Sequence, residues 1–388
     1  MNSFGIIAEF NPLHNGHNYI INTAKSLGAT HVTVALSGNF VQRGEAAIIS
    51  KFKRAEMALK CGADLVIELP LPYSIATANR FAFGGVNILQ HFCDNLIFGS
   101  ETGELDKFFK VLNILKQKEF KEKLEKHLKK GVSFATARFN AIKEIDKDSA
   151  EILNSPNDTL GLEYIYEASK LNKDFDFYAV KRIGADHFGK KRSKYFCSAS
   201  YIRENIKKAK NYMPTEAFEI LKNETKNGKI ASINNLENAI LTKLKSYSAE
   251  DFLQYLDVNE GLHNRIKKSV DRATSIEELY SEIKTKRYAL SRIRRIILSA
   301  FLDIDKSFYN EPIPYVRVLA FNKKGEELIR KAKKDGVNIV TSLKDAESLG
   351  ETAKKFAQLE QNAGKIYGLA YNNKEDFNEY KYKVYKEN

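Results

Sequence analysis

The sequence has few cysteines, no long hydrophobic run and no amino-terminal segment of the kind that directs secretion. Its three cysteines, Cys61, Cys93 and Cys197, are scattered without metal-type spacing, which indicates reduced thiols in or near the core. No stretch reaches the roughly 18 consecutive apolar residues of a membrane helix. Residues 1–5 place no basic region ahead of a hydrophobic one. We therefore expect a cytoplasmic protein with no membrane partner.

The composition otherwise favours a soluble globular chain with a strongly basic surface. Apolar residues make up 43% of the 388 residues, too many for a disordered chain, and the length allows two or three domains. The net charge of +13 would attract nucleic acid, phosphate-rich ligands or anionic lipid. The same charge could also belong to a solvated lysine-rich surface, so charge alone leaves the partner open.

Short apolar runs alternate with helical patterns over the first part of the chain. Buried strands are expected at residues 3–9, 31–36, 64–69, 95–98 and 176–182, and helices at 17–28, 51–61, 74–92, 158–171 and from 200. This alternation predicts a Rossmann-like α/β fold, a parallel sheet with helices on both faces.

The pattern of expected secondary structure changes twice further along the chain. Residues 213–302 read as almost entirely helical, whereas strands at 316–320 and 338–341 flank a helix at 324–334. We expect three parts: an α/β domain at 1–210, a mainly helical region at 211–310 and a small α/β subdomain at 311–388. The polar tail after Tyr371 is expected to fray.

The segment His14-Asn15-Gly16-His17 follows the first strand and opens the first helix. Ligands of open α/β sheets bind beyond the carboxyl ends of the strands, and a helix N-terminus there offers free N–H groups to a phosphate. One helical turn can present both imidazoles to the same oxyanion, which suits attack on the α-phosphate of ATP. Packing histidines or half a metal site are the alternatives, but no set of further ligands completes a metal site.

A second phosphate-binding element is expected at residues 198–203. There Ser200 could cap a new helix while Arg203, three residues on, neutralises leaving-group charge. An ordinary capped helix is the alternative.

A basic stripe is expected on a helix over residues 284–300. On a helical wheel one side carries Lys284, Arg287, Ser291, Arg294 and Arg295, opposite an apolar side. Such a stripe suits a phosphate backbone, although a solvated helix face would look the same.

The two motifs resemble the HxGH and S-S-x-x-I-R motifs of the nucleotidyltransferase superfamily, with Ala199 where a second serine is common. Over roughly residues 1–300 the chain resembles one family more closely, the bacterial tRNA(Met) cytidine acetate ligases. The matching stretches are residues 8–17, 37–45, 53–58, 62–70, 98–101, 156–161, 181–185 and 286–295.

The resemblance implies a two-step reaction. Acetate attacks the α-phosphate of ATP to give acetyl-adenylate and pyrophosphate, and the acetyl group then passes to N4 of the wobble cytidine of elongator tRNA(Met). Mg²⁺ is expected with ATP, but no dedicated carboxylate cage is visible. The catalytic candidates are His14, His17, Ser200 and Arg203. The implied ATP contacts are Ile7, Ala8, Glu9, Phe10, Asn11, Pro12, Leu13, His14, Asn15, Gly16, His17, Asn18, Tyr19, Ile20, Gly99, Asn157 and Arg182.

Physical reasoning agrees with the later members of that set. Gly99 ends a strand where a side chain would crowd adenosine, and Asn157 could bond ribose or base, or simply cap a helix. Arg182 could pair with phosphate or acetate, or form a surface salt bridge. Gln42 and Arg43, in the loop after the second strand, are candidate contacts to acetate or the acyl-adenylate. The candidates for tRNA contact are Arg287, Arg294 and Arg295.

Two other functions remain open. A small-molecule adenylyltransferase or carboxylate–amine ligase of cofactor biosynthesis would share the fold, but the helical region, basic stripe and net charge count against it. An RNA-binding protein with a relic nucleotide site is disfavoured by the intact His14, His17 and Arg203.

Overall fold

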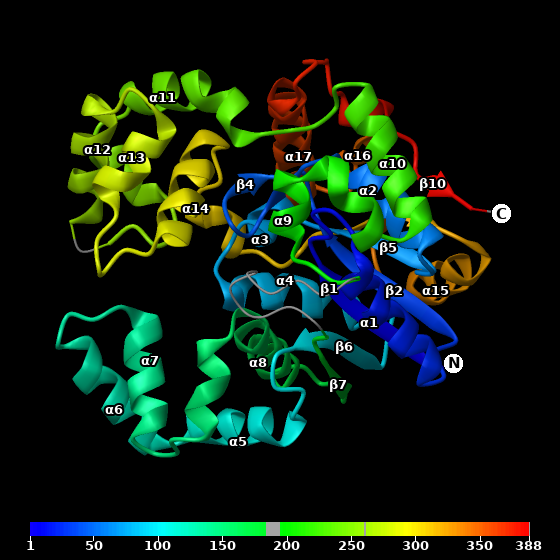
Figure 1. Ribbon diagram of the computed structural model, residues 1–388, viewed down its shortest axis with the longest axis horizontal. Coiled ribbons are helices and arrows are strands. Elements are labelled where there is room, and N and C mark those ends of the chain that lie inside the picture. The colour runs from blue at the N-terminus through cyan, green and yellow to red at the C-terminus, as the bar shows by residue number, and fades with distance from the viewer. Residues whose placement is uncertain (184–194, 260, 388) are drawn as a thin grey trace.

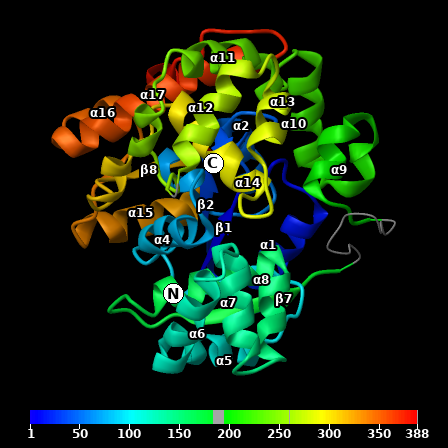
Figure 2. The same ribbon diagram turned by 90° about the vertical axis from the view of Figure 1, so that its left-hand side faces the viewer.

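The computed structural model describes residues 1–183, 195–259 and 261–387. A central sheet carries helices on both faces, and two helical groups, α5–α7 and α11–α14, project to the same side of it (Figures 1 and 2). The strands are β1 (Ser3–Ala8), β2 (His31–Ser37), β3 (Phe40–Val41), β4 (Glu45–Ala46), β5 (Leu65–Leu69), β6 (Asn95–Ser100), β7 (Asp176–Lys181), β8 (Val316–Phe321), β9 (Ile339–Val340) and β10 (Tyr385–Lys386).

Most of the expected helices are present, within a few residues of their expected bounds. They are α1 (Asn15–Ser26), α2 (Lys51–Lys60), α3 (Leu71–Ser74), α4 (Ala78–Leu89), α5 (Leu105–Lys116), α6 (Lys118–Leu128), α7 (Phe134–Lys143), α8 (Pro156–Ala168), α9 (Ala199–Glu204), α10 (Thr215–Lys226), α11 (Glu237–Lys245), α12 (Leu262–Arg272), α13 (Ile276–Ile283), α14 (Leu290–Phe301), α15 (Lys323–Lys334), α16 (Leu343–Glu347) and α17 (Glu351–Ala370). No helix of the described residues has the length and apolar character needed to cross a bilayer.

The strands of the main sheet are ordered β10-β8-β5-β2-β1-β6-β7, with β9 alongside β8. Neighbours from β5 to β7 run parallel, so the carboxyl ends of β1, β2, β6 and β7 meet at one edge. The predicted Rossmann-like parallel core is confirmed, with β8 added antiparallel to β5.

Both faces of the sheet are covered, which explains the continuous apolar runs in the sequence. Successive residues of β5 show this. Val66 packs into the core that includes α1 and α2, whereas Leu65 and Ile67 pack into the core that includes α4 and α8. The strand ends between these layers are the edge at which a ligand is expected.

The carboxyl-terminal residues differ from the expectation of a separate subdomain at 311–388. Strand β8 pairs with β5, and β10 pairs with β8, so these strands extend the central sheet. The expected fraying of the tail is also wrong. Phe377 stacks on Phe52 and Tyr382, and Glu379 is about 1% exposed, because both residues pack against α2 and the sheet.

The expected single helix over 284–300 is also wrong. Lys284 caps the end of α13, Arg287 lies in the turn that follows, and α14 begins only at Leu290. The hydroxyl of Thr285 accepts the backbone N–H groups of Arg287 (3.2 Å) and Tyr288 (3.1 Å), which favours a turn over a helix there. The five basic and polar positions therefore form no continuous helical stripe.

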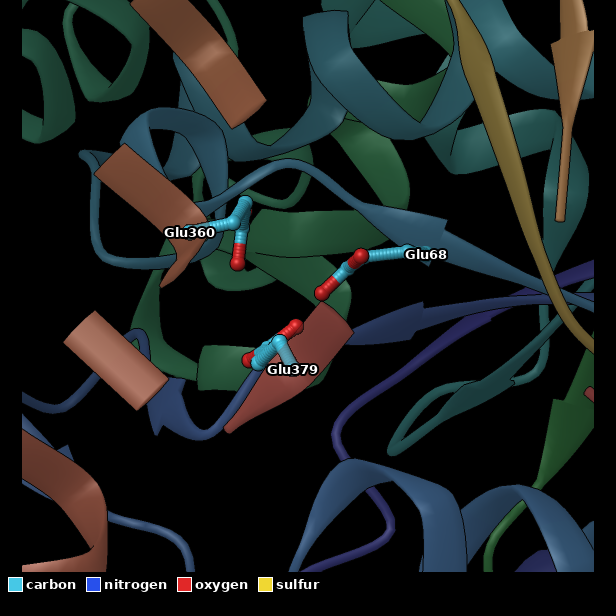
Figure 3. Close-up of side chains that lie close together, drawn as sticks. All are labelled: Glu68, Glu360 and Glu379. Atoms are coloured by element: carbon cyan, nitrogen blue, oxygen red, sulfur yellow. The ribbon is translucent and has the colours of Figure 1, made fainter. Parts of the chain in front are cut away.

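A buried ionic cluster joins the tail to the sheet. Glu68 of β5, Glu360 of α17 and Glu379 point toward one another, with carboxylate oxygens within 4.8 Å (Figure 3). Lys51 lies 3.1 Å from Glu360 and 2.7 Å from Glu379 and also contacts Glu68, while Arg317 lies 3.1 Å from Glu68.

Three clustered carboxylates could in principle hold a metal ion. Here the positive charge comes from Lys51 and Arg317 instead, and both cations are buried. Burial and the neighbouring charge of Glu68 raise the pKa of Glu360, so that it keeps a proton at neutral pH. We interpret the cluster as a structural one, in which two carboxylates balance two cations.

Candidate active site

The junction between β1 and α1 is fixed by a buried arginine. Arg54 of α2 is fully buried and donates to the carbonyl oxygens of Glu9 (2.6 Å), Ser37 (3.0 Å) and Ile49 (3.1 Å). It thereby ties the carboxyl ends of β1 and β2 together. Phe10, which follows Glu9, has a φ of 44°. This backbone conformation is strained for a residue other than glycine, so the surrounding structure must hold Phe10 in it.

The two histidines form a capping box at the start of α1. Nδ1 of His14 accepts the backbone N–H of Gly16 at 3.0 Å, and Nδ1 of His17 accepts that of His14 at 3.3 Å. The rings stack with centroids 3.7 Å apart. Since Nδ1 is an acceptor in both rings, this hydrogen-bond network assigns the proton of each neutral imidazole to Nε2. Both rings are therefore hydrogen-bond donors through Nε2.

Burial keeps both rings neutral. Desolvation, helped by the charge of Arg182, lowers the pKa of His14 to about 3. Desolvation also lowers the pKa of His17, with His14 and Arg182 as further causes. Two neutral N–H donors side by side can bind phosphate oxygens without a proton first being taken up.

This arrangement predicts that both imidazoles stay in the neutral Nε2–H form between pH 8 and pH 5 in the ligand-free protein, measured by ¹⁵N NMR. Below about pH 6.5 the unfolded chain would bind protons that the folded site does not, so the two residues lower stability as the pH falls. A ring that titrates near pH 6.5 would contradict this assignment.

A cavity of about 270 Å³ opens beside the histidines at the carboxyl edge of the sheet. The candidate residues that line it are Ile7, Ala8, Glu9, Phe10, His14, Gly16, His17, Tyr19, Ile20, Gln42, Arg43, Gly99, Asn157 and Arg182. The candidates that do not line it are Asn11, Pro12, Leu13, Asn15, Asn18, Ser200, Arg203, Arg287, Arg294 and Arg295.

Two of the candidates that do not line the cavity form hydrogen bonds that hold neighbouring segments in place. The side chain of Asn11 accepts the backbone N–H of Ile48 at 2.7 Å. The side-chain amide of Asn15 donates to the carbonyl oxygens of Tyr195 (2.9 Å) and Asn211 (3.3 Å), which joins α1 to the segment around α9. Both side chains hold the loop and the helix in place.

Sequence reasoning missed most of the apolar wall. The additional lining residues are Ile6, Phe81, Phe98, Pro156, Leu160, Tyr164, Val180, Lys181, Ile183, Phe196 and Cys197. In the sequence, the apolar residues among these look like core residues. The only feature that could have indicated a ligand site was the position of some of them near strand ends.

Gly99, Asn157 and Arg182 lie together on one side of the cavity. A Cβ at Gly99 would lie 3.2 Å from Ile20 of α1, so little room exists there for a side chain. The alternative that Asn157 caps α8 is wrong, because Ser155 holds that position and Asn157 donates to Glu101 at 2.6 Å. Arg182, directly after β7, lies 3.9 Å from Glu101.

Gln42 and Arg43 stand at the tip of the small β3–β4 hairpin on the other side. The backbone N–H of Gln42 donates to Oε1 of Glu9 at 2.8 Å, which joins the hairpin to the end of β1. Glu45 of the same hairpin binds Arg294 of α14 at 2.6 Å and Arg203 of α9 at 3.5 Å.

The cap of α9 is Ser198 rather than Ser200, because the Ser198 hydroxyl accepts the backbone N–H of Tyr201 at 3.2 Å. Ser200 lies beside it, with the two hydroxyl oxygens 2.9 Å apart. Arg203 donates to the carbonyl oxygen of Asn11 at 2.9 Å. Arg203 therefore contacts the loop before the histidines, Ser200 lies at the start of α9, and neither lines the cavity.

The three tRNA candidates are placed differently from one another. Arg287 is exposed in the turn before α14, while Arg294 and Arg295 are half-buried. A Cβ at Gly44, whose φ is +74°, would lie 2.7 Å from the backbone of Arg294, so α14 packs directly on the hairpin. The helical region thus contacts, through α14, the hairpin whose tip lines the cavity.

The parallel sheet and the paired histidines at its edge are typical of one class of enzymes. The chain belongs to the nucleotidyltransferases that carry the HIGH-type motif, because the family model described as HIGH Nucleotidyl Transferase matches residues 1–382. Within that class it belongs to the tRNA(Met) cytidine acetate ligase family. A relative with that name from Thermoanaerobacter sp. (strain X514) is 38% identical to it, over 96% of each of the two chains. Another, from Clostridium novyi (strain NT), is also 38% identical, over 91% of this chain and 92% of the relative.

Solved structures agree with this assignment. The apo crystal structure of Thermotoga maritima TmcAL superposes with a TM-score of 0.94 at 28% identity, covering 100% of this chain and 99% of that one. A second crystal structure of TmcAL, bound with alpha-thio ATP, has a TM-score of 0.92, again at 28% identity with the same coverage.

Proposed function

We propose that this protein is an ATP-dependent ligase that forms acetyl-adenylate from acetate and ATP, and then acetylates N4 of the wobble cytidine of elongator tRNA(Met). The observation that carries the proposal is the pair of neutral Nε2–H donors of His14 and His17 beside the cavity at the strand edge. The names of the relatives and the ATP analogue bound to TmcAL support it. Because its substrate would be tRNA, we place the enzyme in the cytoplasm.

In the first step the triphosphate would lie over the start of α1. His14 and His17 would donate to phosphate oxygens, and Arg182 would add positive charge from the carboxyl end of β7, at the same edge of the sheet. A carboxylate oxygen of acetate attacks the α-phosphorus, and pyrophosphate leaves with its electron pair. We assign Gly99 and Asn157 to the adenosine, and Ser200 and Arg203 to the leaving phosphates. Mg²⁺ would be held mainly by the phosphates, because the described lining residues include a single carboxylate.

In the second step the cytidine must reach the acetyl group before water does. An anticodon base is already single-stranded and can be turned into a pocket at modest cost. We assign Gln42 and Arg43, which line the cavity from the hairpin that α14 contacts, to acetate or the acyl-adenylate. We propose that the tRNA lies along this side of the molecule.

The test is mass analysis of tRNA incubated with the protein, ATP and deuterated acetate. We expect a labelled acetyl group on the wobble cytidine of elongator tRNA(Met), and pyrophosphate exchange into ATP that requires acetate. Exchange driven by a small cofactor precursor would instead favour the small-molecule adenylyltransferase. Absence of exchange with any carboxylate would favour the RNA-binding protein.

The basic residues of α14 yield a separate prediction. Replacing Arg294 and Arg295 together by alanine should weaken tRNA binding and reduce the dependence of log Kd on log salt by about 1 for each phosphate that these side chains neutralise. Binding is measured by filter retention at several salt concentrations. An unaltered slope would exclude both side chains from the tRNA interface and would leave Arg294 with its role in holding the hairpin through Glu45.

A further inference from the structure

The acetyl transfer needs a group that the first step does not. When N4 of cytidine attacks the acetyl carbonyl carbon, an N–C bond forms and the C–O bond to AMP breaks. AMP leaves with the electron pair of that bond, and N4 must lose a proton. A positioned side chain that takes such a proton typically contributes about 10²–10⁴-fold to the rate.

Most polar residues of the cavity cannot accept that proton. Nδ1 of His14 and of His17 already accepts a backbone N–H, and Nε2 of each carries the proton. The remaining polar lining residues other than Glu9 are cations, amides, phenols or a thiol, namely Lys181, Arg43, Arg182, Gln42, Asn157, Tyr19, Tyr164 and Cys197. Among the described residues that line the cavity, Glu9 is the only carboxylate.

The position of Glu9 fits the role. It follows β1 directly, five residues before His14, and its Oε1 is fixed by the N–H of Gln42 at 2.8 Å. No described residue donates a hydrogen bond to Oε2. A carboxylate oxygen is also the natural acceptor for the N4 amino group of cytosine.

The surroundings of Glu9 make its carboxylate more basic than that of an ordinary glutamate. Burial raises the pKa of its carboxyl group, while Arg43 of the hairpin, Arg203 of α9 and Arg54 of α2 partly oppose this. Tyr164 of α8 also lines the cavity near Glu9: burial, and next to it the charge of Glu9, raises the pKa of that phenol.

We propose that Glu9 is the catalytic base of acetyl transfer: its carboxylate accepts a hydrogen bond from N4 of cytidine and takes the proton that N4 loses. This role rests on the proposed function. After the transfer, the proton returns from Glu9 to solvent. Glu9 thus serves the second step, whereas the histidine pair serves the first.

The experiment compares the two steps separately in the variants Glu9→Gln and Glu9→Asp. Acetate-dependent pyrophosphate exchange reports the first step, and single-turnover transfer from synthetic acetyl-adenylate to tRNA reports the second. Glutamine can still accept the N–H of Gln42, so it changes the charge and basicity while keeping the anchor. We expect Glu9→Gln to slow transfer by about 10²–10⁴-fold and exchange far less, and Glu9→Asp to retain part of the transfer rate.

The pH profile adds a readout that a merely structural role would not move. Transfer by the native protein should rise with pH through the elevated pKa of Glu9 and then level off, and Glu9→Gln should lose that rising limb. Equal losses in exchange and transfer, or no loss in transfer, would overturn the role of Glu9. If the native protein exchanges nothing and transfers nothing, the proposed ligase function itself fails, and the role of Glu9 with it.

Discussion

Replacing His17 by alanine should lower acetate-dependent pyrophosphate exchange by about 10²–10³-fold, the usual cost of removing one preorganised donor from developing oxyanion charge. His17 presents its Nε2–H beside that of His14 because the capping box and ring stacking fix both rings. The variant should keep its affinity for tRNA, since the ring lies in the cavity rather than on the helical region.

A matched control is available in α6. His127 is buried and pairs with Glu144 at 2.8 Å, and it lies outside the cavity lining. His127→Ala should leave exchange unchanged while causing a comparable loss of stability. If His17→Ala turned over at the native rate, or if both variants lost activity equally, the histidine pair would have no specific part in adenylation.

Replacing Lys51 by methionine should destabilise the fold by about 3–5 kcal/mol, because it leaves buried carboxylates without one of their two cations. Lys51 contacts Glu68, Glu360 and Glu379, all buried, and these contacts fasten α17 and the tail to the sheet. The measurement is the free energy of unfolding from urea denaturation.

The control is Lys53→Met, two residues along the same helix. Lys53 is 39% exposed and pairs with Glu56 at 2.9 Å, and such surface pairs contribute about 0–1 kcal/mol. Comparable small losses in both variants would show that the cluster does not depend on Lys51, and the tail would then be held by Arg317 and by its apolar contacts.

The sequence predicted the parts of the molecule that depend on local pattern. Continuous apolar runs placed β1, β2 and β5, and the position of the histidines after β1 placed them at the start of α1 beside the cavity. These features follow from periodicity and from the geometry of strand–helix junctions, which act over a few residues.

The features that were missed depend on contacts between distant segments. Nothing near Val316 shows that β8 pairs with β5, about 250 residues earlier, and nothing near Glu379 shows that it binds Lys51. A turn at Thr285 stands where a helix was expected, because the Thr285 hydroxyl accepts two backbone N–H groups that a helix would use. Phe81 and Tyr164 were hidden because lining an apolar cavity and packing a core require the same residue types.

The central claim is that a carboxylate oxygen displaces pyrophosphate at the α-phosphorus beside the paired imidazoles. Acetate labelled with ¹⁸O in both oxygens tests it during tRNA acetylation. The attacking oxygen stays on phosphorus when the acetyl group leaves, so AMP should carry one ¹⁸O atom and pyrophosphate none. Unlabelled AMP, or formation of ADP in place of AMP, would contradict the claim.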